Sequence, residues 1–125
     1  MQSQTETLIL NISPSFSWTE SFLTQLTATS VMLSSVNFID SQPRNHAISP
    51  IVIMKCSMID EPQKILCVFS PNNDNYQKYE TEFKISTIEN VEFSLWTIDD
   101  NNDLIQWNQL NQIDGYISLT FIFFE

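Results

Sequence analysis

Glycine and basic residues are scarce in this sequence of 125 residues. Glycine occurs once, at Gly115, which excludes the glycine-rich loops that hold phosphates in dinucleotide-binding folds and P-loop enzymes. Lys and Arg together number 5 against 15 Asp and Glu, so the formal net charge is −10. Because a phosphate backbone repels such an acidic surface, we expect no nucleic acid among the partners of this chain.

Metal ligands and long apolar runs are also scarce. One histidine, His46, and two cysteines, Cys56 and Cys67, do not make a zinc cluster, and we expect no metal and no cofactor. The chain has no run of roughly 20 apolar residues that would cross a bilayer as a helix. The short apolar run 8–10 follows no basic residue, unlike a signal peptide. We therefore expect a soluble protein without membrane insertion or a secretory route.

Short stretches that alternate apolar and polar residues recur along the chain. Their spacing is typical of antiparallel sandwiches and barrels, which join many short strands by polar turns. We expect an all-β fold, an antiparallel β-sandwich of jelly-roll type with roughly eight short strands, as one domain over residues 1–125. The predicted strands are 8–12, one or two strands within 31–38, 51–59, 64–70, 83–86, 91–96, 104–107 and 115–124.

Residues 17–27 carry the one helical signal in the chain. Trp18, Phe22 and Leu26 are spaced four residues apart, and Ser17 with Glu20 has the pattern of a capping box. This spacing predicts at most one short helix near 17–27. The threonines of the segment leave an extended connection as the alternative.

Cys56 and Cys67 lie on two strands that the sequence predicts to form a hairpin. Near-opposite cysteines either form a disulfide or pack as two small apolar thiols, and the missing secretory signal favours the thiols. A nucleophilic cysteine would need a base, and His46 is the single histidine that could serve. No other pattern in the chain indicates catalysis, so we expect a protein without enzymatic activity.

Two polar segments are candidates for binding loops. Residues 70–82 are the most polar stretch and are predicted to form an exposed loop. Residues 99–103 carry oxygen ligands at alternate positions, as calcium loops do, but lack the glycine and the final glutamate of such loops. An Asx-rich hairpin turn is therefore the favoured interpretation of this segment. The candidate residues of the two loops are Tyr76, Tyr79, Asp99, Asp100 and Asp103.

Outward-facing aromatic and apolar side chains are candidates for a protein interface. Trp96 is predicted to share the outer face of its strand with Glu92 and Ser94, where either a partner or a loop would cover it. The closing strand 115–124 is apolar on one face throughout and on both faces at its end, and in a small domain a second subunit can supply the second cover. The candidate interface residues are Trp96, Tyr116, Ile122 and Phe124.

The second half of the chain contains PIVIMKCSMID, KILCVFS, YETEFKIS, NVEFSLWTIDDNNDLIQW and YISLTFIFFE in that order. Over about residues 50–125 this series resembles the jelly-roll structural proteins of eukaryotic DNA viruses and of virus-like Polinton transposons. The resemblance implies a capsid-associated, vertex or spike component that acts by assembly, not by catalysis.

We therefore expect the chain to associate with itself, as a trimer, or with other shell proteins. Its place would be the virion or the cytoplasm or nucleus of the host cell. The alternative is a small monomeric binding module of lectin or inhibitor type that uses its polar loops.

Overall fold

The computed structural model describes residues 2–12, 17–23, 27–40, 51–69, 76–78, 81–106 and 115–125. These residues form strands and no helix, which confirms the predicted all-β class. The strands are β1 (Ser3–Asn11), β2 (Ser17–Glu20), β3 (Ser30–Asp40), β4 (Val52–Cys56), β5 (Ile65–Phe69), β6 (Tyr76–Lys78), β7 (Glu82–Lys84), β8 (Val91–Ile98), β9 (Leu104–Gln106) and β10 (Gly115–Phe124).

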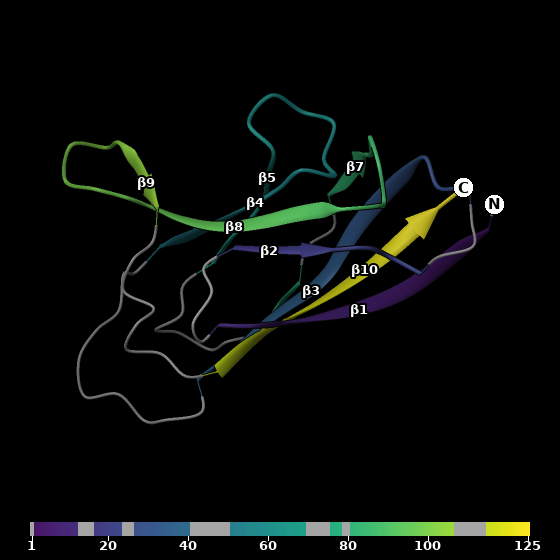
Figure 1. Cartoon of the computed structure of the whole chain (residues 1–125), viewed down its shortest axis with the longest axis horizontal. Coiled ribbons are helices and arrows are strands. Elements are labelled where there is room, and N and C mark those ends of the chain that lie inside the picture. The colour runs from purple at the N-terminus through teal and green to yellow at the C-terminus, as the bar shows by residue number, and fades with distance from the viewer. Residues whose placement is uncertain are drawn as a thin grey trace.

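The strands form two five-stranded antiparallel sheets that pack as a sandwich (Figure 1). Sheet A has the order β1-β10-β3-β6, with β7 also paired to β3. Sheet B has the order β2-β8-β4-β5, with β9 paired to β8. Long strands lie inside each sheet, with a neighbour on both sides: β10 in sheet A and β8 in sheet B.

The core lies between the two sheets and consists of alternate residues of their strands. In β10 the side chains of Ile117, Leu119, Phe121 and Phe123 are completely buried, as the alternation predicts. Phe22, which follows β2, packs edge-on against the rings of Phe121 and Phe123, at centroid distances of 5.2 and 4.8 Å. Each buried ring contributes about 1.5–3 kcal/mol through the hydrophobic effect.

The helix predicted near 17–27 is wrong where the structure describes the segment. Ser17–Glu20 is the strand β2, paired antiparallel with β8, and residues 24–26 lie outside the described residues. The edge of β8 offers backbone partners to this segment, and the Trp18 indole Nε1 donates to the Asn11 carbonyl at 2.8 Å. The four-residue spacing of Trp18 and Phe22 reflects two side chains that pack toward the core, and tertiary pairing overrides the local helical signal.

Within the loop predicted over 70–82, the structure describes residues 76–78 and 81–82, and the other residues lie outside the described part of the chain. Tyr76–Lys78 forms β6 and Glu82 begins β7, and both pair with β3 at different positions along it. The reason is the length of β3, whose 11 residues leave a long edge of backbone groups that need partners. Sequence alternation suggested one or two strands within 31–38, and the structure has one.

Candidate assembly surface

The four predicted interface residues do not lie on one surface. Tyr116, Ile122 and Phe124 are half-buried on β10, where they alternate with the buried core residues and so lie on the outer face of sheet A. Trp96 lies on β8, on the outer face of sheet B. Because the sheets pack through their inner faces, these two outer faces point in opposite directions. One flat interface therefore cannot include all four residues.

The outer face of sheet A is built in rows across β1, β10 and β3. Phe124 lies between Ser3 and Ser30, and Ile122 lies between Thr5 and Met32. In the next row the hydroxyls of Thr7 and Thr120 are hydrogen-bonded at 3.1 Å. The outward positions of these three strands are hydroxyl, amide or apolar residues, namely Ser3, Thr5, Thr7, Ile9, Asn11, Tyr116, Ser118, Thr120, Ile122, Phe124, Ser30, Met32, Ser35 and Asn37.

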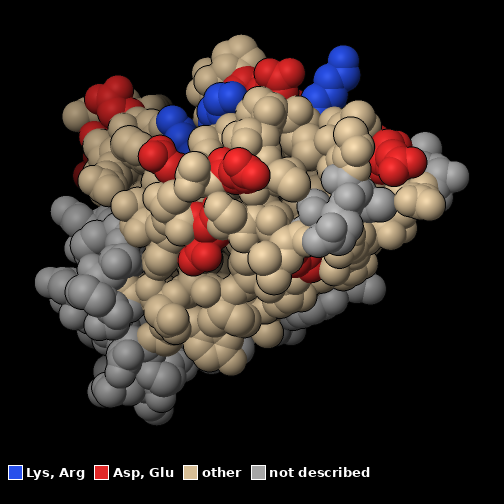
Figure 2. Space-filling view, turned by 45° about the vertical axis from the view of Figure 1, so that its right-hand side comes forward, with Lys and Arg blue, Asp and Glu red and all other residues tan. Residues whose placement is uncertain are grey.

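This face carries no acidic or basic residue at those described positions, although the chain has 15 Asp and Glu. Charge begins at its border, where Lys84 and Glu82 of β7 pair with Ser30 and Met32. In Figure 2 the basic and most of the acidic side chains lie in the upper half of the view, two acidic patches lie near its middle, and the described surface below them is neutral. The acidity of the chain is therefore distributed unevenly over its surface.

The neutral face spans three strands of sheet A. β1 has 9 residues and so extends about 30 Å, at about 3.3 Å per residue. Its three strands abreast at about 4.8 Å spacing give a width of about 14 Å, hence an area of about 400 Å². Specific interfaces begin at about 600 Å² per partner, so a contact centred on this face would also include part of its border.

Trp96 lies in a different environment on sheet B. The Lys55 ammonium is 4.8 Å from the centroid of the Trp96 ring, and the indole Nε1 donates to Ser94 Oγ at 2.8 Å. Ile53, directly opposite Trp96 in the ladder, is only 6% exposed although it lies outside the main core cluster. Neighbours in its own sheet thus partly cover Trp96, which leaves it a weaker interface candidate than the residues of β10.

The two cysteines are free and buried. They lie on β4 and β5, which form the predicted hairpin, but the ladder pairs Met54, not Cys56, with Cys67. After a register shift at Met54, the Cys56 N–H donates to the Lys64 carbonyl. Burial raises the pKa of the Cys56 thiol to about 12 and raises the pKa of Cys67 as well. Both thiols stay protonated near neutral pH, so neither is an activated nucleophile, and His46 lies outside the described residues.

The segment 99–103 is an Asx turn, as the favoured interpretation predicted. Asp99 Oδ1 accepts hydrogen bonds from the backbone N–H groups of Asn101 and Asp103, both at 2.9 Å. Asn102 has a positive φ of 63°, a conformation that asparagine tolerates without glycine. Among the described residues no cluster of three or more His, Cys, Asp or Glu could hold a metal ion. Of the other loop candidates, Asp100 is exposed, Tyr76 belongs to β6, and Tyr79 is outside the described residues.

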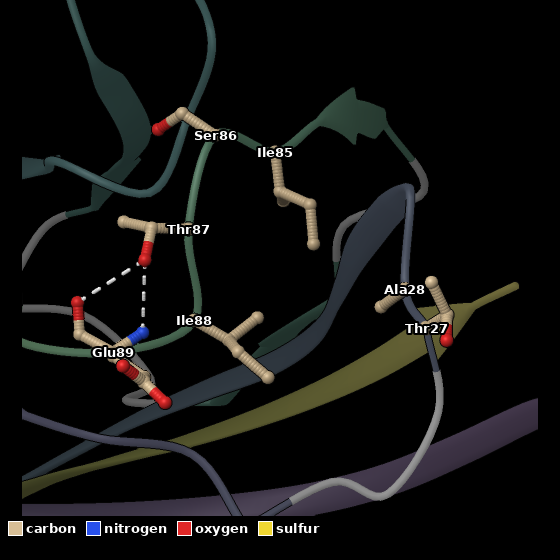
Figure 3. Close-up of a pocket in the computed structure, with 7 residues that line it drawn as sticks. All are labelled: Thr27, Ala28, Ile85, Ser86, Thr87, Ile88 and Glu89. Atoms are coloured by element: carbon tan, nitrogen blue, oxygen red, sulfur yellow. Dashed lines mark hydrogen bonds between the residues drawn. The ribbon is translucent and has the colours of Figure 1, made fainter.

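A pocket of about 310 Å³ that sequence reasoning missed lies between residues 27–28 and 85–89. Figure 3 shows Ala28, Ile85 and Ile88 around its interior, while the Thr87 hydroxyl is bonded to the backbone of Glu89. The two segments are held together because Ile85 N donates to the Thr29 carbonyl at 3.3 Å. The pocket is at the lower size limit of ligand sites. No sequence signal reveals it, since loop packing forms it.

Neither the models of known protein families nor the curated proteins include a match to this chain. In the described residues, no helix has the length and apolar character needed to cross a bilayer.

Proposed function

We propose that this chain is a non-enzymatic structural protein of capsid or spike type that assembles with copies of itself through the outer face of sheet A. The observation that carries the proposal is the neutral face formed by β1, β10 and β3 on a chain of net charge −10. On this face Tyr116, Ile122 and Phe124 supply apolar contact area, and serine and threonine hydroxyls supply hydrogen bonds.

Electrostatics favours this face over the rest of the surface. Two carboxylates brought to about 4 Å repel by about 1 kcal/mol even in water, and by more when a contact excludes water. Copies that meet through acidic turns such as 60–61 or 99–103 would accumulate such terms. Copies that meet through sheet A avoid them, because salt already screens charges separated by more than about 8 Å.

A jelly-roll arrangement is part of this proposal. The chain passes repeatedly between the sheets, and β1 lies beside β10, the first strand beside the last. We count β6 and β7 as one interrupted strand, and we count β9 together with β8, its hairpin partner. Sheet A then holds the first, last, third and sixth strands. Sheet B then holds the second, seventh, fourth and fifth. This interleaving supports the resemblance to viral jelly-roll structural proteins.

The test is the mass of the protein in solution, measured by size-exclusion chromatography with light scattering over a range of concentrations. We expect an oligomer, a trimer on the viral interpretation, and at least a tenfold weaker association for Ile122→Glu. The matched control is Ile98→Glu, which adds the same charge at a side chain that is 45% exposed on sheet B. Circular dichroism checks that both variants are folded.

Two results would contradict the proposal. One is a wild-type monomer at every concentration, and saturable binding of a glycan by that monomer would then favour the binding module. The other is an oligomer that Ile122→Glu and Ile98→Glu weaken equally, because the neutral face would then have no special part in the contact.

A further inference from the structure

Among the described strands, β1 is an edge strand of sheet A: β10 pairs with one of its sides, and no described strand pairs with the other. Its 9 residues make it the longest edge strand among those described, since β2, β5, β6, β7 and β9 have between 3 and 5 residues. Figure 1 shows β1 beside β10 at the margin of the sheet. Natural proteins usually shorten, bend or charge such an edge, because its free backbone groups can pair with another strand.

The register determines which backbone groups of β1 are free. Glu125 N donates to the Gln2 carbonyl at 3.2 Å, and Ile12 N donates to the Gly115 carbonyl at 3.0 Å, so even-numbered residues of this strand bond to β10. In an antiparallel ladder the alternate residues then direct N–H and C=O away from the partner. The Asn11 carbonyl follows this rule, because Trp18 Nε1 reaches it from the open side.

Four residues of β1 therefore present free backbone donors and acceptors in the described structure: Ser3, Thr5, Thr7 and Ile9. The strand has no proline and no lysine to discourage pairing, and its one charged residue, Glu6, accepts a hydrogen bond from Leu23 N at 2.6 Å. Leu23 and Ile9 are 79% and 50% exposed, the two highest values among the exposed large apolar residues that the structure describes. Both lie at this edge: Ile9 is a residue of β1, and Leu23 is held beside β1 by its hydrogen bond to Glu6.

We propose that β1 pairs antiparallel with β1 of a second copy, across a two-fold axis at Thr7, so that two copies of sheet A become one continuous sheet. The partner must supply a strand with free backbone groups at alternate residues and uncharged side chains at those residues, and an identical β1 supplies this with closed two-fold symmetry. The inference rests on the self-assembly proposed above but uses the edge of sheet A, not its outer face. Edge and face contacts together would extend assembly beyond a single closed oligomer.

The register follows from charge and from the hydroxyl row. With Thr7 opposite Thr7, Thr5 is opposite Ile9 and Glu6 is opposite Leu8, so the two Glu6 carboxylates are not paired. A register centred on Glu6 would place these carboxylates directly opposite each other, which is destabilising. The Thr7–Thr120 hydroxyl pair of each copy would then continue across the axis as one row of threonines.

Cysteine cross-linking tests the register directly. Opposite hydrogen-bonded residues have Cα atoms about 5.5 Å apart, within the range that a disulfide spans. We expect Thr7→Cys to form a covalent dimer under mild oxidation, read by non-reducing electrophoresis. Thr5→Cys is the matched control, because in this register its two copies lie four residue positions apart along the pair. Cys56 and Cys67 are buried and should not react.

A proline variant tests the backbone contact without relying on a disulfide. Thr7→Pro removes an N–H that points away from β10 and so leaves the internal ladder intact. We expect at least tenfold weaker dimerisation in sedimentation velocity than for Thr7→Val, which keeps the N–H group. Equal association of these two folded variants, or equal cross-linking of Thr5→Cys and Thr7→Cys, would overturn the edge proposal.

The two proposals fail in different ways. Thr7→Cys dimers that persist in an Ile122→Glu background support the edge contact even if the face contact is absent. An oligomer that Ile122→Glu disrupts while Thr7→Cys forms no covalent dimer overturns the edge contact and leaves the face contact standing.

Discussion

The central strands of the two sheets bury the same kind of side chain on their inner faces and differ on their outer faces. β8 contributes Val91, Phe93 and Leu95 to the core, and β10 contributes its own apolar series, all of them completely buried. On its outer face β8 lies among charged residues, with Glu92 on the strand itself and Lys55 over Trp96. The outer face around β10 is neutral at the described positions. The inward residues of a strand therefore form the core independently of whether its outward residues are charged or neutral.

The largest expected effect tests the difference between the inner and outer faces of β10. Phe121→Ala should lower the free energy of unfolding by about 3–5 kcal/mol, because it removes a fully buried ring that contacts Phe22 and Phe123. Phe124→Ala, from the half-buried outer face, is the control and should cost much less. Urea unfolding at a concentration where the protein is monomeric measures both, and equal losses would show that the outer face is part of the core.

An intermediate effect is expected from the two cysteines, both of which lie in sheet B. Because burial raises the pKa of Cys56 from 9.0 to about 12, the folded state holds its proton more tightly than the unfolded state. The stabilisation is complete below pH 9 and is lost as pH rises toward 12, with a total of a few kcal/mol. The loss of stability between pH 9 and 12 should shrink in Cys56→Ala with Cys67→Ala, as measured by urea unfolding, and an unchanged slope would contradict the assignment.

The smallest expected effect concerns the outer face of sheet B. Lys55→Met keeps most of the side-chain contact with Trp96 but removes its charge, so stability should fall by about 0.5–1 kcal/mol, the value of a cation–π contact at an exposed site. Lys84→Met, which removes a charge from the exposed strand β7, is the control and should change stability less. The melting temperature at several salt concentrations measures the difference, and equal shifts would mean that the Lys55–Trp96 contact adds nothing.

Local pattern predicted most of the strands correctly because burial alternates along them. The series 91, 93 and 95 and the series 117, 119, 121 and 123 are both recovered, as is the turn at 99–103. The pattern failed at β2 and β6, whose short segments are polar or helix-like by themselves. Their strand form depends on the open edges of β8 and β3, which lie far away in the sequence.

The sequence predicted only part of the candidate surface. Tyr116, Ile122 and Phe124 are identified by alternation along one strand, but their neighbours on β1 and β3 come from residues that the sequence does not place beside them. The separation of Trp96 from this group likewise depends on which sheet each strand joins. The pocket between residues 27–28 and 85–89 exists only because two distant connections meet.

The amino-acid sequence by itself determined the all-β class, the inward face of each long strand and the acidic balance of the chain, because these depend on residue type and on the two-residue period of a strand. Only the tertiary structure decided that the described outer positions of β1, β10 and β3 carry no acid, that β1 is an edge among the described strands, and that the cysteines are offset from each other. These features depend on pairing between distant segments, and pairing is set by the register of backbone hydrogen bonds, which no local pattern specifies.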